Sequence, residues 1–297
     1  MITGSSGFIG KNVKEYLKKN NKDYEVFAPP RKELDCLQEE AVTDYLKEHR
    51  FDYVLHFASY GVGLIRKDKM ERDEHRGELL NLDLRIFLNF AKNSMYYGKM
   101  YCVGSGAEYD KRYDIVNISE ESIGKTIPVD NYGLMKYTIN QMIEKSDNIY
   151  NFRIFGAFGK YEYYPARFVS LACCKVIKGL PLSIKQNVYF DYLWVDDFCR
   201  MVECFLWKEP RFHSYNMVSG EKITLEEICN MVLSVSGKEI PLYICREGFA
   251  KEYTASNKRF LDEMPSFKYT SMERAIKEVY KWYQENEDII DVYNLLY

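Results

Sequence analysis

The chain has little of what metal centres, disulfide scaffolds and membrane spans require. Its 297 residues include only 4 His and 8 Cys, and no two cysteines stand in a C-x-x-C pair. Dispersed residues of this kind predict no metal site and no disulfide framework, but reduced, mostly buried thiols in a cytoplasmic protein. No apolar run is long enough to cross a bilayer, and the first residues show no basic segment before an apolar core, so we expect no membrane partner.

The chain also lacks an excess of positive charge. Its 41 Lys and Arg against 44 Asp and Glu give a net charge of −3. That balance disfavours nucleic acid or an anionic membrane as the main partner. Hydrophobic residues make up 46% and charged residues 29%, and no internal repeat is visible. This composition and length predict a globular protein with one large domain or two modest ones.

Three glycines near the start form an informative pattern. Spaced three residues apart, they follow a very short apolar strand at residues 1–2 and precede a helix predicted over 11–20. Glycine permits a tight strand-to-helix turn and a close approach of a diphosphate, and a helix N-terminus offers free N–H groups. A plain glycine cap is the alternative, but the position in the first such turn favours phosphate binding. We predict cofactor contacts here from Gly4, Ser6, Gly7, Phe8, Ile9 and Gly10.

Downstream, predicted strands alternate with helices in the rhythm of a parallel, doubly wound α/β sheet. Strands are expected over 23–28, 51–58, 100–104, 152–156 and 214–218, and helices over 39–49, 78–93, 132–145 and 195–207. After Gly159 the pattern changes. Helices over 166–178, 224–236 and 271–285, with short strands near 182 and over 240–245, predict a smaller C-terminal α+β lobe. The predicted division is 1–160 plus 190–218 for the first domain, and 161–189 plus 219–297 for the lobe.

The end of the second predicted strand bears on which dinucleotide is bound. An acid at that place accepts hydrogen bonds from the ribose diol of NAD, whereas an arginine pairs with the 2′-phosphate of NADP. This chain has Arg31 and Lys32, with no acid before Glu33. The pattern favours NADP(H) over NAD(H), with a solvated basic loop as the alternative. Asp35, just beyond, is placed to accept from the adenine amino group.

Tyr132 and Lys136 are four residues apart, so on a helix they share one face. Positive charge one turn away stabilises a phenolate, which lets a tyrosine move a proton near neutrality, and the lysine can also bond a ribose. Ser105, at the end of a predicted strand, can hold a carbonyl or hydroxyl beside the tyrosine. A surface contact is the alternative for the Tyr/Lys pair alone. The combination of the glycine turn, the strand-end serine and the Tyr/Lys pair is far more specific than the pair alone.

These motifs resemble the extended short-chain dehydrogenases/reductases, in the NAD-dependent epimerase/dehydratase group that acts on nucleotide sugars. The likeness covers the glycine turn, Tyr132-x-x-x-Lys136, and the positions 56–59, 81, 103–105, 109, 153–159, 192–197, 215–217 and 223–228. It implies a Rossmann domain with a nucleotide-sugar lobe, and hydride transfer between nicotinamide and a sugar carbon, usually C4. By this likeness the catalytic residues are Ser105, Tyr132 and Lys136. The further cofactor contacts that it implies are Phe57, Ala58, Ser59, Asn81, Tyr132, Lys136 and Phe155.

Departures from the family pattern narrow the reaction. The 4,6-dehydratases carry an Asp-Glu pair directly after the catalytic hydroxyl residue, and Gly106 and Ala107 stand there in this chain, which disfavours dehydration. Residues 31–35 resemble GDP-fucose synthase and the dTDP-4-keto-rhamnose reductases, which reduce 4-keto sugars with NADPH. Ala107 also replaces the cysteine that GDP-fucose synthase uses for epimerisation. The resemblance predicts a 4-keto-sugar reductase. The alternatives are a 4-epimerase with tightly bound NAD and a non-catalytic NADP(H)-binding regulatory protein.

The resemblance also bears on the substrate lobe and on assembly. Many relatives have an arginine directly before the acid that matches Asp191, where it grips the nucleotide diphosphate, but Phe190 stands there in this chain. The charge is then left to one of three other arginines, each of which is alternatively a solvated surface residue: Arg167, Arg246 or Arg259. The family usually pairs through the helices that follow Asn81 and Tyr132. We therefore expect a homodimer that binds a nucleotide-diphosphate sugar.

Overall fold

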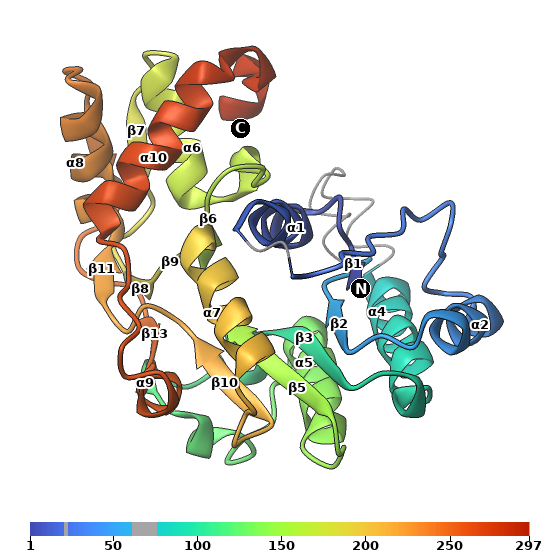
Figure 1. Ribbon diagram of the computed structural model, residues 1–297. Helices are drawn as coiled ribbons and strands as arrows, with labels where there is room; N and C mark the ends of the chain where they lie inside the picture. Colours follow the sequence, from blue (N-terminus) through green and yellow to red (C-terminus); the bar gives the residue numbers. More distant parts are fainter. Residues whose placement is uncertain (21–22, 61–75, 297) are drawn as a thin grey trace. The chain divides into compact units, whose positions relative to one another are not determined.

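The computed structural model describes residues 1–20, 23–60 and 76–296, with side chains given outside 76–79 (Figure 1). The chain forms two compact units, which are taken separately. The first comprises residues 1–113, 120–154 and 199–217, and the second comprises 114–119, 155–198 and the chain from 218 onward. Residues 190–198, placed in the first domain by the sequence, group with the second unit because their strands pair with strands of that unit.

A five-stranded parallel sheet forms the centre of the first unit. Its order is β1-β2-β3-β5-β10. The strands are β1 (Ile2–Thr3), β2 (Tyr53–His56), β3 (Lys99–Ser105), β5 (Ile149–Ile154) and β10 (Ser214–Met217). Each neighbouring pair is parallel, so all five carboxyl ends meet at one edge of the sheet. The predicted parallel α/β sheet is confirmed.

Helices cover both faces of this sheet. They are α1 (Phe8–Asn20), α2 (Glu39–His49), α4 (Arg76–Ala91), α5 (Asn131–Ile143) and α7 (Val195–Trp207), with 3₁₀ turns η2 (Ser94–Tyr96), η3 (Gly106–Glu108) and η4 (Glu120–Ser122). α1 begins three residues earlier than expected, inside the glycine turn. α2 and α7 have the predicted bounds.

The alternation of side chains along β3 explains the two-sided packing. Met100 and Cys102 point into a buried cluster with residues of α2, α4 and α5, including Phe90. Tyr101, between them, faces the other side, where its ring stacks on Phe152 at 4.9 Å and its hydroxyl donates to the Phe205 carbonyl of α7 at 2.7 Å. Because strand side chains alternate with a period of two, both faces need helical cover.

One predicted strand is absent. Residues 23–28 form no strand, and β1 is the edge strand among the residues that the structure describes. A single backbone bond joins this segment to β1, from Ile2 N to Phe27 O at 2.7 Å. β1 has only two residues, which leaves little length for a ladder. Pro29 and Pro30, which lack N–H donors, follow at once.

The second unit combines short strands with four helices. Its sheets are β11-β8-β13-β4, β12-β7 and β6-β9. The strands are β4 (Ile115–Ile118), β6 (Ala157–Phe158), β7 (Leu182–Ile184), β8 (Tyr189–Asp191), β9 (Leu193–Trp194), β11 (Lys222–Thr224), β12 (Leu242–Ile244) and β13 (Tyr253–Ala255). The helical elements are α6 (Phe168–Ile177), α8 (Leu225–Ser236), α9 (Lys258–Glu263), α10 (Met272–Glu285), η5 (Tyr164–Ala166), η6 (Glu287–Ile289) and η7 (Val292–Leu295).

Caps and apolar faces define the helices of this unit. Thr224 and Glu227 form a reciprocal capping box at the start of α8, and Gly237 ends the helix in the left-handed conformation. The apolar face of α10, including Ala275 and Ile276, enters a buried cluster with α6 and α8. Trp282, expected to face inward, is half-buried and packs edge-on against Tyr161 at 5.2 Å.

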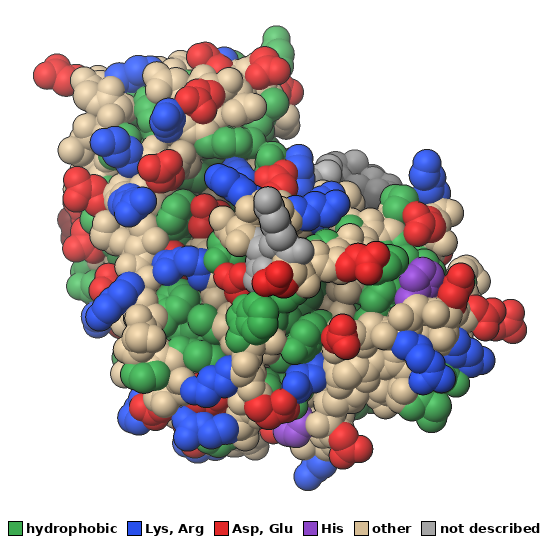
Figure 2. All heavy atoms as spheres, viewed as in Figure 1, with side chains coloured by type: hydrophobic (Ala, Val, Ile, Leu, Met, Phe, Trp, Pro, Cys, Tyr) green, Lys and Arg blue, Asp and Glu red, His purple; other side chains and the backbone are tan. Residues whose placement is uncertain are grey.

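The thiols and the surface charge agree with an ordinary globular chain. All eight cysteines are free, and five of them are buried. Within the described residues no helix has the length and apolar character to span a bilayer. Acidic and basic side chains are interspersed on the face drawn in Figure 2.

A buried polar network joins η3 to β5 and β10 in the first unit. Arg153 of β5 and Glu108 of η3 are both fully buried, with Arg153 Nε 2.8 Å from a Glu108 carboxylate oxygen. Arg153 also donates to the side-chain oxygens of Asn140 and Asn216, at 3.2 and 3.0 Å. Asn151 donates to the same carboxylate at 3.0 Å. Burial is the largest single influence on the pKa of Arg153 and lowers it, but the charge and hydrogen bond of Glu108, together with nearby Tyr109 and Glu120, outweigh burial, so the net pKa is raised.

This network generates a stability prediction. Glu108→Gln leaves the Arg153 guanidinium buried without its anion, and breaking a buried pair from one side costs about 3–5 kcal/mol. We expect the free energy of unfolding to fall by that amount in a urea titration followed by circular dichroism.

The matched control is Lys92→Gln. Lys92 pairs with Glu39 on the surface of the same unit at 3.0 Å, and both side chains are more than half exposed. Exposed pairs contribute about 0–1 kcal/mol, so this variant is expected to unfold near the wild-type midpoint. If the two variants unfold at the same urea concentration, the predicted contribution of Glu108 to the free energy of unfolding is wrong.

Candidate active site

The glycine turn is built as tightly as its sequence suggests. Gly4 has a φ of +63°, and a Cβ there would lie 2.6 Å from the carbonyl oxygen of Phe57. A Cβ on Gly10 would collide with the carbonyl oxygen of Gly4. Gly7 N donates to Gly4 O at 2.9 Å, and α1 starts at Phe8 directly after it. The first N–H groups of a helix have no intrahelical acceptor, so this corner suits an anion. Ser6 and Gly7 are exposed there, while Phe8 and Ile9 are half-buried.

Thr3 of β1 forms hydrogen bonds to the residues at the end of β2 and directly after it. Its hydroxyl oxygen accepts from the backbone N–H groups of Phe57 and Ala58, each at 3.1 Å. The same oxygen lies 3.2 Å from His56 Nδ1. Burial first, and then the charge of Lys136, lower the pKa of His56 to about 3, so the ring is neutral. Which of the two groups donates in this hydrogen bond depends on the ring nitrogen that carries the proton. The sequence motif includes Thr3, but its partners on β2 lie more than 50 residues away.

The loop after β2 contains three predicted cofactor residues, of which Ser59 has a clear partner. Phe57, Ala58 and Ser59 are half-buried, and the Ser59 hydroxyl donates to Asp83 of α4 at 2.7 Å. Asp83 is only 6% exposed and also accepts from the backbone N–H of Tyr60. Asn81, the predicted contact on α4, has an exposed side chain. Sequence reasoning missed Asp83, although a lone acid on the inner face of a helix is a usable signal.

Arg31 and Asp35 lie beside the same loop. The Arg31 guanidinium is 3.4 Å from the Asp35 carboxylate and sits over the Tyr60 ring, 4.7 Å from its centroid. The Arg31 side chain is 67% exposed. Asp35 uses its other oxygen to accept from Leu37 N at 3.1 Å. An exposed guanidinium retains donors for an anion, which fits the predicted role of Arg31.

Ser105 stands at the carboxyl end of β3, where it caps η3. Its hydroxyl oxygen accepts from Ala107 N at 3.1 Å, and its backbone N donates to Glu108 at 2.9 Å. Ser105 is half-buried, so its hydroxyl is both fixed in place and reachable. A hydroxyl can donate while it accepts, which leaves its proton for a ligand oxygen.

Tyr132 and Lys136 lie on α5, and α5 packs on η3. Asp130 caps the helix by accepting from Gly133 N at 2.9 Å. A Cβ on Gly133 would lie 2.5 Å from the Ala107 carbonyl oxygen, so only glycine permits this approach. Lys136 Nζ donates to the Val103 carbonyl of β3 at 2.9 Å. Tyr132 is 36% exposed. The structure thus brings all three predicted catalytic residues onto elements in direct contact at one corner.

Two buried groups, His56 and Cys102, lie near the ammonium of Lys136. Cys102, like His56, is buried, and burial raises its pKa to about 12 although the charge of Lys136 acts in the opposite direction. A neutral imidazole and a neutral thiol therefore lie near the ammonium. Neither competes with a ligand oxygen for its charge.

The second unit contains Phe155 and the position that the sequence analysis singled out at Phe190. Phe155 packs against Tyr253 with tilted rings whose centroids are 4.8 Å apart, and Phe190 packs against the same tyrosine at 5.0 Å. A Cβ on Gly156 would lie 2.8 Å from the Phe190 ring, so the ring rests directly on the backbone there. Three arginines were considered for the diphosphate: Arg167 and Arg246 are exposed, and Arg259 is half-buried.

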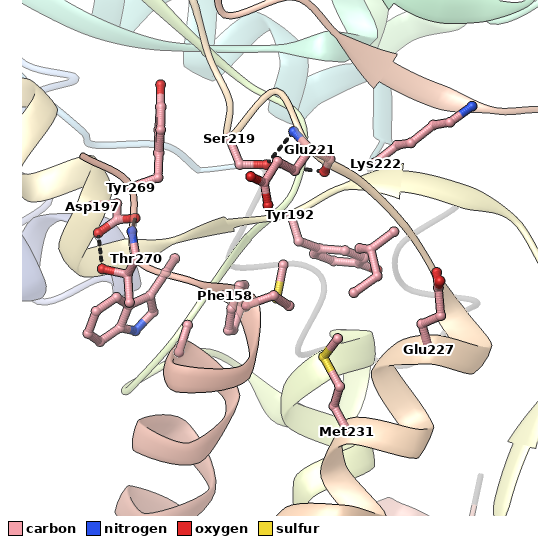
Figure 3. Close-up of a pocket in the computed structure, with 14 residues that line it drawn as sticks. Phe158, Tyr192, Asp197, Ser219, Glu221, Lys222, Glu227, Met231, Tyr269 and Thr270 are labelled. Carbon is pink, nitrogen blue, oxygen red and sulfur yellow. Dashed lines mark hydrogen bonds between the residues drawn. The ribbon is translucent and has the colours of Figure 1, made fainter. Parts of the chain in front are cut away.

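A cavity of about 230 Å³ also lies in the second unit (Figure 3). Aromatic and apolar residues line it, including Phe158, Tyr192 and Met231, with Glu221 and Glu227 among its polar residues. Asp197 accepts from the backbone N and hydroxyl of Thr270, each at 2.8 Å, which fixes the segment before α10. No residue predicted for the cofactor or for catalysis lines this cavity. Among the described residues no three His, Cys, Asp or Glu side chains come together as metal ligands.

The chain is similar to several known proteins. A curated relative, GDP-L-colitose synthase from Yersinia pseudotuberculosis, is 26% identical over 192 residues, covering 61% of this chain and 60% of its own length. GDP-6-deoxy-D-talose 4-dehydrogenase from Aggregatibacter actinomycetemcomitans is 21% identical and matches 95% of this chain and 96% of its own. The crystal structure of a GDP-L-fucose synthetase from Naegleria fowleri bound to NADP has a TM-score of 0.80, 17% identity, and covers 97% and 94%.

The family model described as the NAD dependent epimerase/dehydratase family matches residues 1–217. That span contains the glycine turn, Ser105, Tyr132 and Lys136, and it covers well over half of the sequence. The chain belongs to the NAD dependent epimerase/dehydratase family.

Proposed function

We propose that the protein is an NADP(H)-dependent oxidoreductase that reduces the 4-keto group of a nucleotide-linked deoxy sugar. The observation that carries this proposal is the docking of α5 on β3 and η3, through Gly133 against Ala107 and Lys136 against Val103. Tyr132, Lys136 and Ser105 are thereby held at the carboxyl edge of the parallel sheet that also ends in the glycine turn. Ligands of open α/β sheets bind along that edge.

The residues fit a dinucleotide in named roles. The N–H groups at the start of α1 and the glycine turn would hold the diphosphate, and a Cβ at Gly4 or Gly10 would close that corner. Arg31 would pair with a 2′-phosphate. Lys136 has three donors, of which Val103 takes one, so the others can bond the nicotinamide ribose. When bound, the reduced nicotinamide supplies a hydride to the keto carbon.

The chain's own residues then complete the reduction. Ser105 donates a hydrogen bond to the keto oxygen and holds it beside Tyr132. The Tyr132 hydroxyl gives its proton to that oxygen as the carbon receives the hydride, so the ketone becomes an alcohol. The positive charge of Lys136 stabilises the resulting phenolate until solvent reprotonates it. The two curated relatives described above are each named after a GDP-linked sugar, which makes a GDP-4-keto-6-deoxyhexose the first substrate to test.

Removal of the proton donor tests the catalytic roles. With a GDP-4-keto-6-deoxyhexose and NADPH, Tyr132→Phe is expected to lower kcat by about a hundredfold to ten-thousandfold, the usual contribution of a positioned acid. The dissociation constant for NADPH, measured by fluorescence titration, is expected to change little. Tyr137→Phe, on the same helix, is the matched control and should retain full turnover. A Tyr132→Phe variant as active as the control would sink the catalytic assignment and favour a regulatory binding protein.

A ligand panel separates reductase from epimerase. Thermal-shift measurements with NADPH, NADH and UDP-, dTDP-, CDP- and GDP-sugars should show the largest rise in Tm with NADPH and one nucleotide sugar, because ligands that bind the native state stabilise it. The purified protein is expected to need added NADPH for turnover. Release of bound NAD on denaturation, with turnover in the absence of added cofactor, would establish the epimerase instead.

We also propose that the protein forms a homodimer through α4 and α5. Leu134 and Met142 on α5 are 42% and 40% exposed and lie eight residues apart, close to one face of the helix. Burial of that face against a second copy would remove apolar surface from water. Light scattering at micromolar concentration should give twice the chain mass of 35.2 kDa. A single-chain mass would contradict the dimer.

A further inference from the structure

The loop after β2 and the segment before α2 meet through one aromatic side chain, Tyr60. Its ring lies under the Arg31 guanidinium, 4.7 Å from the centroid, while the Asp35 carboxylate lies 3.4 Å from a terminal nitrogen of the same guanidinium. The guanidinium is therefore held at its face by the ring and at its edge by the carboxylate. Tyr60 itself is half-buried, and its hydroxyl oxygen is shielded from solvent.

A buried acid sets the place of Tyr60. Asp83 of α4 accepts from the backbone N–H of Tyr60 and from the Ser59 hydroxyl, the latter at 2.7 Å, and is 6% exposed. The loop backbone is thus fixed to a helix of the core, although most of the Arg31 side chain is in solvent. Three elements distant in sequence, at residues 31–35, 59–60 and 83, act together to fix one cation.

We infer that Tyr60 is a specificity-determining positioning residue, which holds Arg31 in the orientation that recognises the 2′-phosphate of the cofactor. This inference rests on the proposed NADP(H) dependence. An arginine loses much rotamer freedom when it binds a phosphate, and a guanidinium already stacked on a ring loses less of it. Asp35 uses only one of the five N–H donors, so others remain for a dianion.

Two small nucleotides isolate this subsite from the rest of the cofactor. Adenosine 2′,5′-bisphosphate contains the 2′-phosphate, and 5′-AMP lacks it. Isothermal titration of the full chain with each should show that the wild type prefers the bisphosphate. Tyr60→Leu is expected to reduce that preference about three- to tenfold and to leave the affinity for 5′-AMP unchanged. This reduction corresponds to the loss of an exposed cation–π contact and of the order that the contact gives to Arg31.

Tyr60→Phe is the matched control, because it keeps the ring and removes only the hydroxyl. It should retain the wild-type preference. On an Arg31→Leu background, which by itself abolishes the preference, Tyr60→Leu should have no further effect on the bisphosphate, because the two residues act as one unit. Thermal melts of all variants check that the loop and the sheet remain folded.

The outcomes separate this inference from the function on which it rests. A wild type that binds both nucleotides equally overturns the NADP(H) preference and the inference with it. A wild type that prefers the bisphosphate, with a Tyr60→Leu variant of unchanged preference, overturns only the role of Tyr60. A loss of affinity that is equal for both nucleotides assigns Tyr60 to packing of the loop and likewise refutes the inference.

Discussion

A buried carboxylate and a buried guanidinium, Glu108 and Arg153, join the elements that carry the proposed catalytic residues. Neither charge can be left alone in the interior, because an unpaired buried ion costs several kcal/mol, so the pair must form whenever this fold forms. Glu108 follows Ser105 by three residues and accepts its backbone N–H. The electrostatic requirement of the core therefore also fixes the strand-end serine.

The network leaves little freedom to its neighbours. A Cβ at Gly104 would collide with the side chains of both Asn151 and Glu108, so the residue before Ser105 is restricted to glycine by the network beneath it. Gly133 is restricted in the same way by the Ala107 carbonyl. The proposed active site thus depends on the lack of a side chain at these two glycines as well as on its polar side chains. Its proposed reactive groups are held close together because the backbones of α5 and η3 are in direct contact.

The parts of the site that local spacing encodes could be predicted from the sequence. Tyr132 and Lys136 share a helical face whatever surrounds them, and the glycine turn was identifiable from three residues and the helix after it. The family match confirms the class to which these motifs were assigned. The roles of the individual residues stay predictions.

The partners supplied by distant segments could not be predicted. Thr3 acts on residues 56–58, and Asp83 acts on residues 59–60, and no short-range pattern connects them. The expected strand at 23–28 is absent because its neighbour β1 offers only two residues for pairing, which is a property of the pairing and not of the segment. Phe190 was flagged as a departure, but its packing on Gly156 became visible only with the fold.

The two neutral groups near Lys136, His56 and Cys102, have a consequence for kinetic measurements. His56 ionises only near pH 3 and Cys102 only near pH 12, because burial disfavours the charged form of each. Across the range in which such a protein can be assayed, the charge below the proposed site is therefore constant. An inflection in its pH–rate profile within that range therefore does not arise from the ionisation of His56 or Cys102.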